Sequence, residues 1–143
     1  MANYECVTRS NYFHVKDPDA FRKFMGRVYG GVEVWEEKDN AGQLVFGFGA
    51  YGGICGINPP EDQADDDQYD DSYDTFVNGL QDHIADDDAV IILESGYEKM
   101  RYVVGSAIIV THAEIEYLDI SSCAVQRGAE LLKNPEWATK CDY

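Results

Sequence analysis

Apolar residues recur at helical spacing in three stretches of the chain. The first stripe consists of Ala20, Phe21, Phe24, Met25, Val28 and Tyr29, and the second of Tyr73, Phe76, Val77, Leu80 and Ile84. The third consists of Ala124, Val125, Ala129, Leu131 and Leu132. Each set falls on one side of a helix with 3.6 residues per turn, so the pattern predicts three amphipathic helices.

Short polar residues and glycines set the expected ends of these helices. Pro18 suits the first helical position, and Gly30-Gly31 should end the first helix. The second helix should extend to about residue 85 and the third to about residue 133. The expected N-terminal caps are Asp17 for the first, Asp71 or Ser72 for the second, and Ser121 or Ser122 for the third.

The remaining apolar segments favour strands, because they are short, rich in β-branched and aromatic residues, and bounded by turn residues. Residues 39–42 predict a hairpin loop, and residues 95–99 predict a turn. The expected strands are Tyr4–Val15, Val32–Glu37, Gln43–Tyr51, Ala89–Glu94, Met100–Thr111 and Tyr117–Ile120.

The order of elements, βαββ-αβββ-α, indicates an α+β protein. Neighbouring strands joined by short turns imply a mostly antiparallel sheet, with the three helices packed on one face. A chain of 143 residues fits one domain, 1–143. Residues 59–71 lack any apolar pattern and predict an exposed acidic loop outside the core.

Charge changes this picture, because it is concentrated in one window. Between Lys38 and Lys99 there is no Lys or Arg, and the window holds fifteen of the 27 acids, hence −15 of the formal charge of −16. Residues 61–74 alone contain eight carboxylates. Nucleic acids and anionic membranes are themselves polyanions, so the acidity predicts no direct nucleic-acid binding and a partner that is basic or a cation.

Sequence motifs for chemistry are weak. The acidic run does not fit the calcium loop of an EF-hand, because position 12 falls on Phe76 or Val77 in the two possible registers. A G-x-G-x-x-G pattern begins at Gly47, but an acidic loop follows it instead of a helix, which favours structural glycines. His14, His83 and His112 are scattered and accompany no nucleophile motif. We therefore expect no catalytic residue, no bound metal and no cofactor.

Two interpretations of the acidic window remain. A run of acids is often a solvated surface that aids solubility. Alternatively, carboxylates without neutralising bases can imitate the closely spaced phosphates of DNA and occupy a basic groove, with tyrosines as anchors. The candidate partner-binding residues are Glu61, Asp62, Asp65, Asp66, Asp67, Asp70, Asp71, Asp74, Asp82, Asp86, Asp87, Asp88, Tyr69 and Tyr73.

In size, charge and the acidic stretch between Glu61 and Asp88, the chain resembles the small acidic inhibitors that phages and mobile elements direct against host nucleases. These are the anti-CRISPR and anti-restriction proteins, several of which act as DNA mimics. The resemblance implies a non-enzymatic inhibitor whose partner is a basic nucleic-acid-binding protein, either a nuclease or a CRISPR or restriction effector. The alternatives are an immunity protein against a basic toxin nuclease, a calcium-binding protein and an enzyme of unrecognised type.

The expected setting is the cytosol. No apolar run reaches the length of about 18 residues that could span a membrane, and the first residues do not have the pattern of a signal peptide. Cys6, Cys55, Cys123 and Cys141 show no C-x-x-C spacing, which favours free thiols in a reducing compartment.

Overall fold

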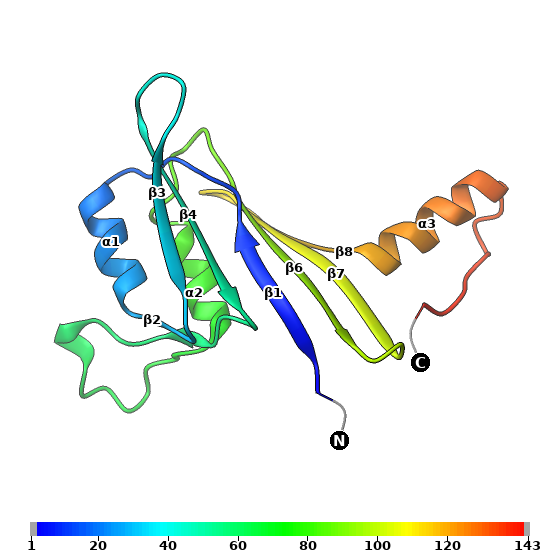
Figure 1. The fold of residues 1–143 in the computed structure, drawn as a ribbon, viewed down its shortest axis with the longest axis horizontal. Helices are drawn as coiled ribbons and strands as arrows, with labels where there is room; N and C mark the ends of the chain where they lie inside the picture. The colour runs from blue at the N-terminus through cyan, green and yellow to red at the C-terminus, as the bar shows by residue number, and fades with distance from the viewer. Residues whose placement is uncertain (1–2, 142–143) are drawn as a thin grey trace.

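The computed structural model describes residues 3–141 and consists of an antiparallel six-stranded sheet, a two-stranded sheet and three α-helices (Figure 1). In spatial order, the large sheet contains β3 (Glu33–Lys38), β4 (Leu44–Tyr51), β1 (Glu5–Ser10), β6 (Val90–Glu98), β7 (Tyr102–Val110) and β8 (Ile115–Asp119). The small sheet pairs β2 (Val28–Tyr29) with β5 (Gly56–Ile57). The α+β class and the mostly antiparallel sheet are confirmed.

Helices α1 (Pro18–Gly26) and α2 (Tyr73–Leu80) pack on one face of the sheet at the end that carries β3 and β4 (Figure 1). Both begin where the sequence predicts. The Asp17 carboxylate accepts hydrogen bonds from the backbone N–H groups of Asp19 and Ala20, and the Ser72 hydroxyl accepts one from Thr75. These caps satisfy backbone donors that the first helical turn leaves unpaired.

The core between the helices and the sheet is built from aromatic rings. Phe21 on α1 lies 4.9 Å from Phe46 on β4, and Phe24 stacks on Phe76 of α2 at 5.8 Å between ring centroids. Phe48 completes the group edge-on to Phe76 at 5.6 Å. All five rings are buried, so they bring the two helices and β4 into one hydrophobic cluster.

The first strand is shorter than predicted. It ends at Ser10, because at the next residue the side chain of Asn11 takes over the pairing with the segment that begins β6. The Asn11 side-chain NH2 donates to the Ala89 carbonyl, and the Asn11 side-chain oxygen accepts from the Ile91 N–H. Beyond it, Phe13 and Val15 form only isolated bridges, to Phe46 and Ile84.

Both N-terminal helices also end earlier than predicted. After α1 ends at Gly26, the apolar residues Val28 and Tyr29 pair with Ile57 and Gly56 as a strand. After α2 ends at Leu80, residues 81–83 form turns, Ile84 forms a bridge with Val15, and the Lys16 N–H donates to the His83 carbonyl. Backbone pairing with distant segments therefore replaces the last helical turns.

The C-terminal part of the sheet also differs from the prediction. Strand β6 continues through residues 95–98, which were expected to form a turn, and pairs with β7 as far as Glu98 and Tyr102. The turn comes at Lys99, which has a positive φ of 52°. Strand β8 begins at Ile115, two residues before the predicted strand.

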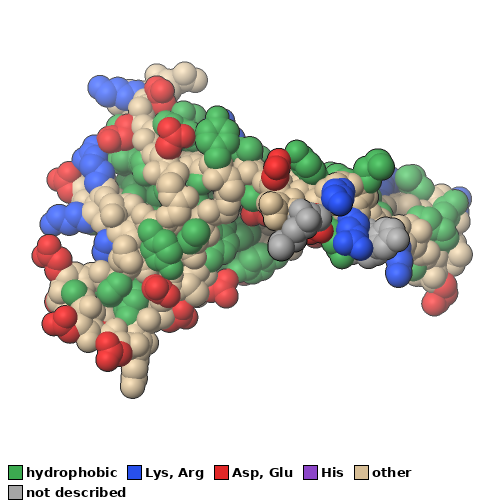
Figure 2. All heavy atoms as spheres, turned by 60° about the horizontal axis from the view of Figure 1, so that its bottom comes forward, with side chains coloured by type: hydrophobic (Ala, Val, Ile, Leu, Met, Phe, Trp, Pro, Cys, Tyr) green, Lys and Arg blue, Asp and Glu red, His purple; other side chains and the backbone are tan. Residues whose placement is uncertain are grey.

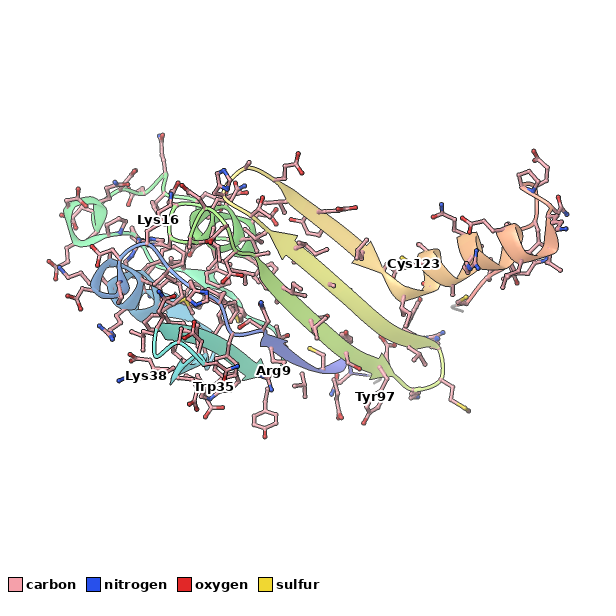
Figure 3. All side chains as sticks on the ribbon, turned by 90° about the horizontal axis from the view of Figure 1, so that it is seen from above. Arg9, Lys16, Trp35, Lys38, Tyr97 and Cys123 are labelled. Atoms are coloured by element: carbon pink, nitrogen blue, oxygen red, sulfur yellow. The ribbon has the colours of Figure 1, made fainter. Side chains whose placement is uncertain are left out.

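Helix α3 (Ile120–Leu132) extends away from the rest of the molecule (Figures 1 and 3). Asp119 caps it instead of Ser121 or Ser122, accepting from the Ser122 N–H at 3.2 Å. No residue of α3 is buried, so its predicted apolar stripe does not contribute to the core. Its main contacts are with β7 and β8, and Ile120 lies over Gly105. By the strand register, Gly105 faces the side of the sheet opposite α1 and α2.

Candidate functional site: an acidic surface beside helix α2

The acidic loop 59–71 is exposed, as predicted, and is held at its base. Short turns order it, including a 3-10 helix at Glu61–Gln63. At its end, the Asp71 carbonyl accepts from the Ile57 N–H at 3.1 Å and from the Tyr29 hydroxyl at 3.3 Å. Gly56 makes this close approach possible, because a Cβ there would collide with the Asp71 carbonyl oxygen. The small sheet therefore fixes the loop to the body of the molecule.

Most of the predicted carboxylates have no cationic partner. Within residues 3–141, ten acids of this region form no ion pair with Lys, Arg or His, and all ten are exposed. Figure 2 shows acidic side chains gathered on the end of the body that carries the loop. The ten are Glu61, Asp62, Asp65, Asp66, Asp67, Asp70, Asp71, Asp74, Asp82 and Asp87.

Two of these acids continue the surface along α2. Asp74 and Asn78 are exposed and four residues apart, so they share the outer side of the helix, and the exposed Asp82 follows in the turn just after the helix ends at Leu80. The core stripe of Phe76, Val77 and Leu80 lies on the other side. Sequence reasoning placed Asp74 and Asp82 in the site but missed Asn78, although the same spacing predicts its exposure. The helix has eight residues and is thus about 12 Å long, instead of the roughly 20 Å expected for 13 residues.

A second helix extending to about residue 85, as predicted, would have placed the three acids at 86–88 together at its C-terminal end, but the structure does not place them there. They lie six to eight residues beyond α2 and have separate roles. Asp88 is partly buried and accepts hydrogen bonds from the His14 backbone N–H and from its own neighbour Ala89, each at 2.8 Å. Asp86 lies 3.4 Å from the Lys16 ammonium. Only Asp87 remains exposed without an ion pair among the described residues.

His14 joins two of the window's acids in a clamp. Its Nδ1 lies 2.8 Å from Asp88 Oδ2, and its Nε2 lies 2.7 Å from Asp39 Oδ2 in the β3–β4 hairpin. Hydrogen bonds to Asp39 and then to Asp88 raise the pKa of His14, while the hydrogen bond from His14 is the main cause of a lowered Asp39 pKa. Burial opposes ionisation of Asp88, but hydrogen bonds from His14 and Ala89 outweigh it and lower its pKa. The clamp is structural and removes Asp39 and Asp88 from the free acidic surface.

The two predicted tyrosine anchors differ in their surroundings. Tyr69 is half-buried in the acidic loop. Tyr73 packs against the core beside Phe76, with 6.0 Å between ring centroids. Burial, followed by the nearby Glu94 and Tyr117, raises the pKa of Tyr73 to about 12. Tyr73 is therefore a neutral core-edge residue and is not presented with the exposed carboxylates.

The other candidate chemistry has structural explanations. Gly49 lies beneath Trp35, where a Cβ would come within 2.7 Å of the indole, so the glycine pattern allows an aromatic ring to approach the strand. His83 packs on Phe24 with 4.5 Å between ring centroids, and burial lowers its pKa. Among residues 3–141, no three His, Cys, Asp or Glu side chains converge as metal ligands would, and all four cysteines are free thiols.

Comparison with protein-family models, curated proteins and solved structures found no match to this chain. Within residues 3–141, no helix combines the length and the apolarity that crossing a bilayer requires.

Proposed function

We propose that this protein is a DNA-mimic-like inhibitor that binds the basic nucleic-acid-binding surface of a nuclease or of a CRISPR or restriction effector. The observation that carries this proposal is the set of ten exposed carboxylates on loop 59–71, at Asp74 in α2, and at Asp82 and Asp87 beyond it, none of which forms an ion pair within residues 3–141. A surface whose charges are neutralised internally could not attract a basic groove, whereas this one is free to do so.

The way the loop is held supports the same proposal. Its base is fixed by the contacts of Asp71 with Ile57 and Tyr29, so the carboxylates are displayed from a folded support. Ordering a flexible acidic tail on binding would cost conformational entropy that a preorganised surface avoids. Catalysis has no role in this proposal, since inhibition follows from occupying the DNA site.

The test uses purified nucleases of three kinds: a guide-loaded CRISPR effector, a restriction enzyme and a basic toxin nuclease. DNA cleavage and DNA binding are measured with increasing amounts of this protein at about 50 and about 200 mM salt. We expect competition with DNA for at least one of these enzymes, weakening at least tenfold at the higher salt because many charge contacts are screened. Inhibition of the toxin nuclease alone would favour an immunity protein.

Matched variants test where the inhibitor binds. Asp65, Asp67, Asp74, Asp82 and Asp87 are changed together to Asn in one variant. In the control, five exposed glutamates elsewhere are changed to Gln, namely Glu33, Glu37, Glu114, Glu116 and Glu136. Both variants lose the same charge, but only the first should lose inhibition. Equal loss in both would show that net charge alone acts, and full inhibition by the first would exclude this surface.

A further inference from the structure

Half of the large sheet is left open on one face. The register places Val7, Tyr51, Leu93, Tyr97, Val103 and Leu118 on the side opposite α1 and α2, and we refer to these six residues as the bare face. Their exposed fractions range from 39% for Leu118 to 86% for Tyr51. Figure 3 shows Tyr97 on this side of the sheet, together with Arg9 and Trp35. In a single copy, an apolar sheet surface therefore lacks the layer that would cover it.

Helix α3 is also only partly covered by its own chain: among residues 3–141, Trp137 lies over Gly128, but the apolar side chains at the two ends of the helix remain exposed. Ile120, Leu131 and Leu132 are 63%, 68% and 59% exposed, and the helix has only two charged residues, Arg127 and Glu130. An isolated helix of 13 residues is marginally stable in water and normally depends on packing of its apolar side. The helix extends away from the strands, so the exposed Leu131 and Leu132 at its far end do not lie over the sheet of their own chain (Figure 1).

We infer that this protein forms a symmetric dimer in which α3 of each copy lies across the bare face of the other. Each copy has both an exposed apolar helix and an open sheet face. A two-fold axis between two copies would place each helix on the sheet face of the other copy, so one arrangement covers both surfaces. A hollow of about 400 Å³ marks where the bare face adjoins α3 and is lined by Leu93, Gly105, Ala107, Leu118, Ile120 and Cys123.

The exposed area is sufficient for a stable dimer. At roughly 150–250 Å² for an aromatic side chain and less for an aliphatic one, the exposed fractions of the bare face and of Ile120, Leu131 and Leu132 amount to about 1,000 Å² in each copy, divided between the sheet and the helix. A standard interface buries about 800 Å² from each partner.

Charge selects this end of the molecule for self-association. Residues 1–88 carry a formal charge of −13, and residues 89–143 carry −3. Two copies that met through their acidic loops would repel each other, whereas the proposed contact involves β6, β7, β8 and α3, with only Val7 and Tyr51 from residues 1–88, and does not involve these loops. The acidic loops then stay free, so the dimer leaves both candidate inhibitory surfaces accessible.

The primary measurement is the mass of the full-length protein by sedimentation equilibrium at about 1–100 µM in 0.15 M salt. We expect twice the chain mass of 16.1 kDa, with a dissociation constant that stays the same or falls at 0.5 M salt, because salt screens the repulsion between copies. A protein that is monomeric throughout this range contradicts the inference, and so does a dimer that salt dissociates.

Three variants locate the interface. Leu93→Lys with Val103→Lys places charges on the bare face, and Leu131→Lys with Leu132→Lys places them on α3. Each pair should raise the dimer dissociation constant at least tenfold. Val34→Lys is the control, since Val34 is also 40% exposed but lies on β3. The α3 variant, Leu131→Lys with Leu132→Lys, should keep the rest of the protein folded, because no residue of this helix is buried. Circular dichroism would verify that it is folded.

Mixing the two variants distinguishes helix exchange from face-to-face contact. The bare-face variant retains an intact α3, and the α3 variant retains an intact bare face, so a mixed dimer recovers one of the two contacts. We expect the mixture to associate more tightly than either variant alone, and iodoacetamide to modify Cys123 more slowly in the wild-type dimer than in the α3 variant. A mixture no tighter than its components, or an effect of Val34→Lys equal to theirs, would exclude the proposed arrangement.

Discussion

At the scale of single residues, the chain uses some of its acids to hold segments together. His14 lies between Asp39 and Asp88, which are 25 and 74 positions away along the chain. The sequence shows the charges of all three residues but not their meeting, because the contact depends on how the β3–β4 hairpin and the loop before β6 fold back to the end of β1. Exposure without pairing in loop 59–71 was predictable, since no Lys or Arg occurs nearby.

The clamp predicts a pH-dependent contribution to stability. The raised pKa of His14 means that its contribution is fully present below its unfolded pKa of about 6.5 and is lost as the pH rises through the folded value. The lowered pKa values of Asp39 and Asp88 mean that their contributions are lost only in acid, below about pH 4. The stability difference between wild type and His14→Ala should therefore be larger at pH 5.5 than at pH 8.5.

Thermal unfolding of both proteins at the two pH values measures this difference. Comparing wild type with variant removes shared contributions, including that of His83, whose pKa shifts in the opposite direction. A difference that is constant, or larger at pH 8.5, would show that His14 is not held as a cation by its two carboxylates.

At the scale of elements, local pattern predicted the starts of α1 and α2 and the β3–β4 hairpin well. The predicted α1 and α2 extended too far at their C-terminal ends, because tertiary pairing competes with helix propensity. Val28 and Tyr29, for example, continue the apolar stripe of α1 but pair with β5 instead. For α3, the stripe of Leu131 and Leu132 predicts a buried side, yet both side chains stay exposed within residues 3–141, where Trp137 covers only the helix surface at Gly128. Amphipathicity indicates that a surface needs a partner, not where the partner is.

A substitution in the aromatic core should cost much more stability than substitutions on the acidic surface. Phe24 is 4% exposed and contacts Phe76 and His83, so Phe24→Ala should leave a cavity that costs about 3–5 kcal/mol. Changing Asp65, Asp66 and Asp67 together to Asn should alter stability by less than about 0.5 kcal/mol, since all three are exposed. Urea unfolding of the two variants provides the comparison, and the division between core and acidic surface is wrong if their effects are reversed.

The base of the acidic loop gives a separate expectation. Gly56→Ala would force a Cβ against the Asp71 carbonyl, so the small sheet should open at a cost of about 1–3 kcal/mol. Glutamyl endopeptidase should then cleave after Glu61 several times faster than in the wild type, because the loop is no longer held at its base. Gly31→Ala is a useful control, since its Cβ would meet no atom within 4 Å, although its φ of 78° also strains alanine. Equal cleavage of wild type and Gly56→Ala would show that this contact does not hold the loop.

At the scale of the whole molecule, charge and apolar surface are separated. The body formed by residues 1–88 carries −13, and the β6–β7–β8 end with α3 carries little charge but much exposed apolar area. The charge asymmetry is visible in the sequence alone. The bare face is not, because alternating residues of β6 and β7 predict two sheet faces without showing which face the helices cover.

The concentrated charge predicts that salt stabilises the fold. Repulsion among the unpaired carboxylates opposes folding, so raising sodium chloride from about 20 to about 200 mM should stabilise the protein by roughly 1 kcal/mol, or about 3 °C in Tm. The variant with Asn at 65, 66 and 67 should respond less because part of the repulsion is gone. The protein concentration is chosen so that the protein is in one oligomeric state at both salt concentrations, which keeps dimerisation from contributing to the change. Destabilisation by salt would mean that the ion pairs of Arg22, Lys16 and His14 outweigh the repulsion.

The central position of β1 also determines when the fold can form. This strand pairs with β4 on one side and β6 on the other, and the Tyr97 hydroxyl donates to Glu5 across 92 positions of sequence. At a synthesis rate of roughly 5–20 residues per second, β1 waits about 5–20 s for its second neighbour to be made. Closing so large a loop is slow compared with forming a helix. We therefore expect the pairing of β1 with β6 to limit the rate of folding, and the edge of β1 that pairs with β6 stays unpaired in the nascent chain until Glu98 has been made.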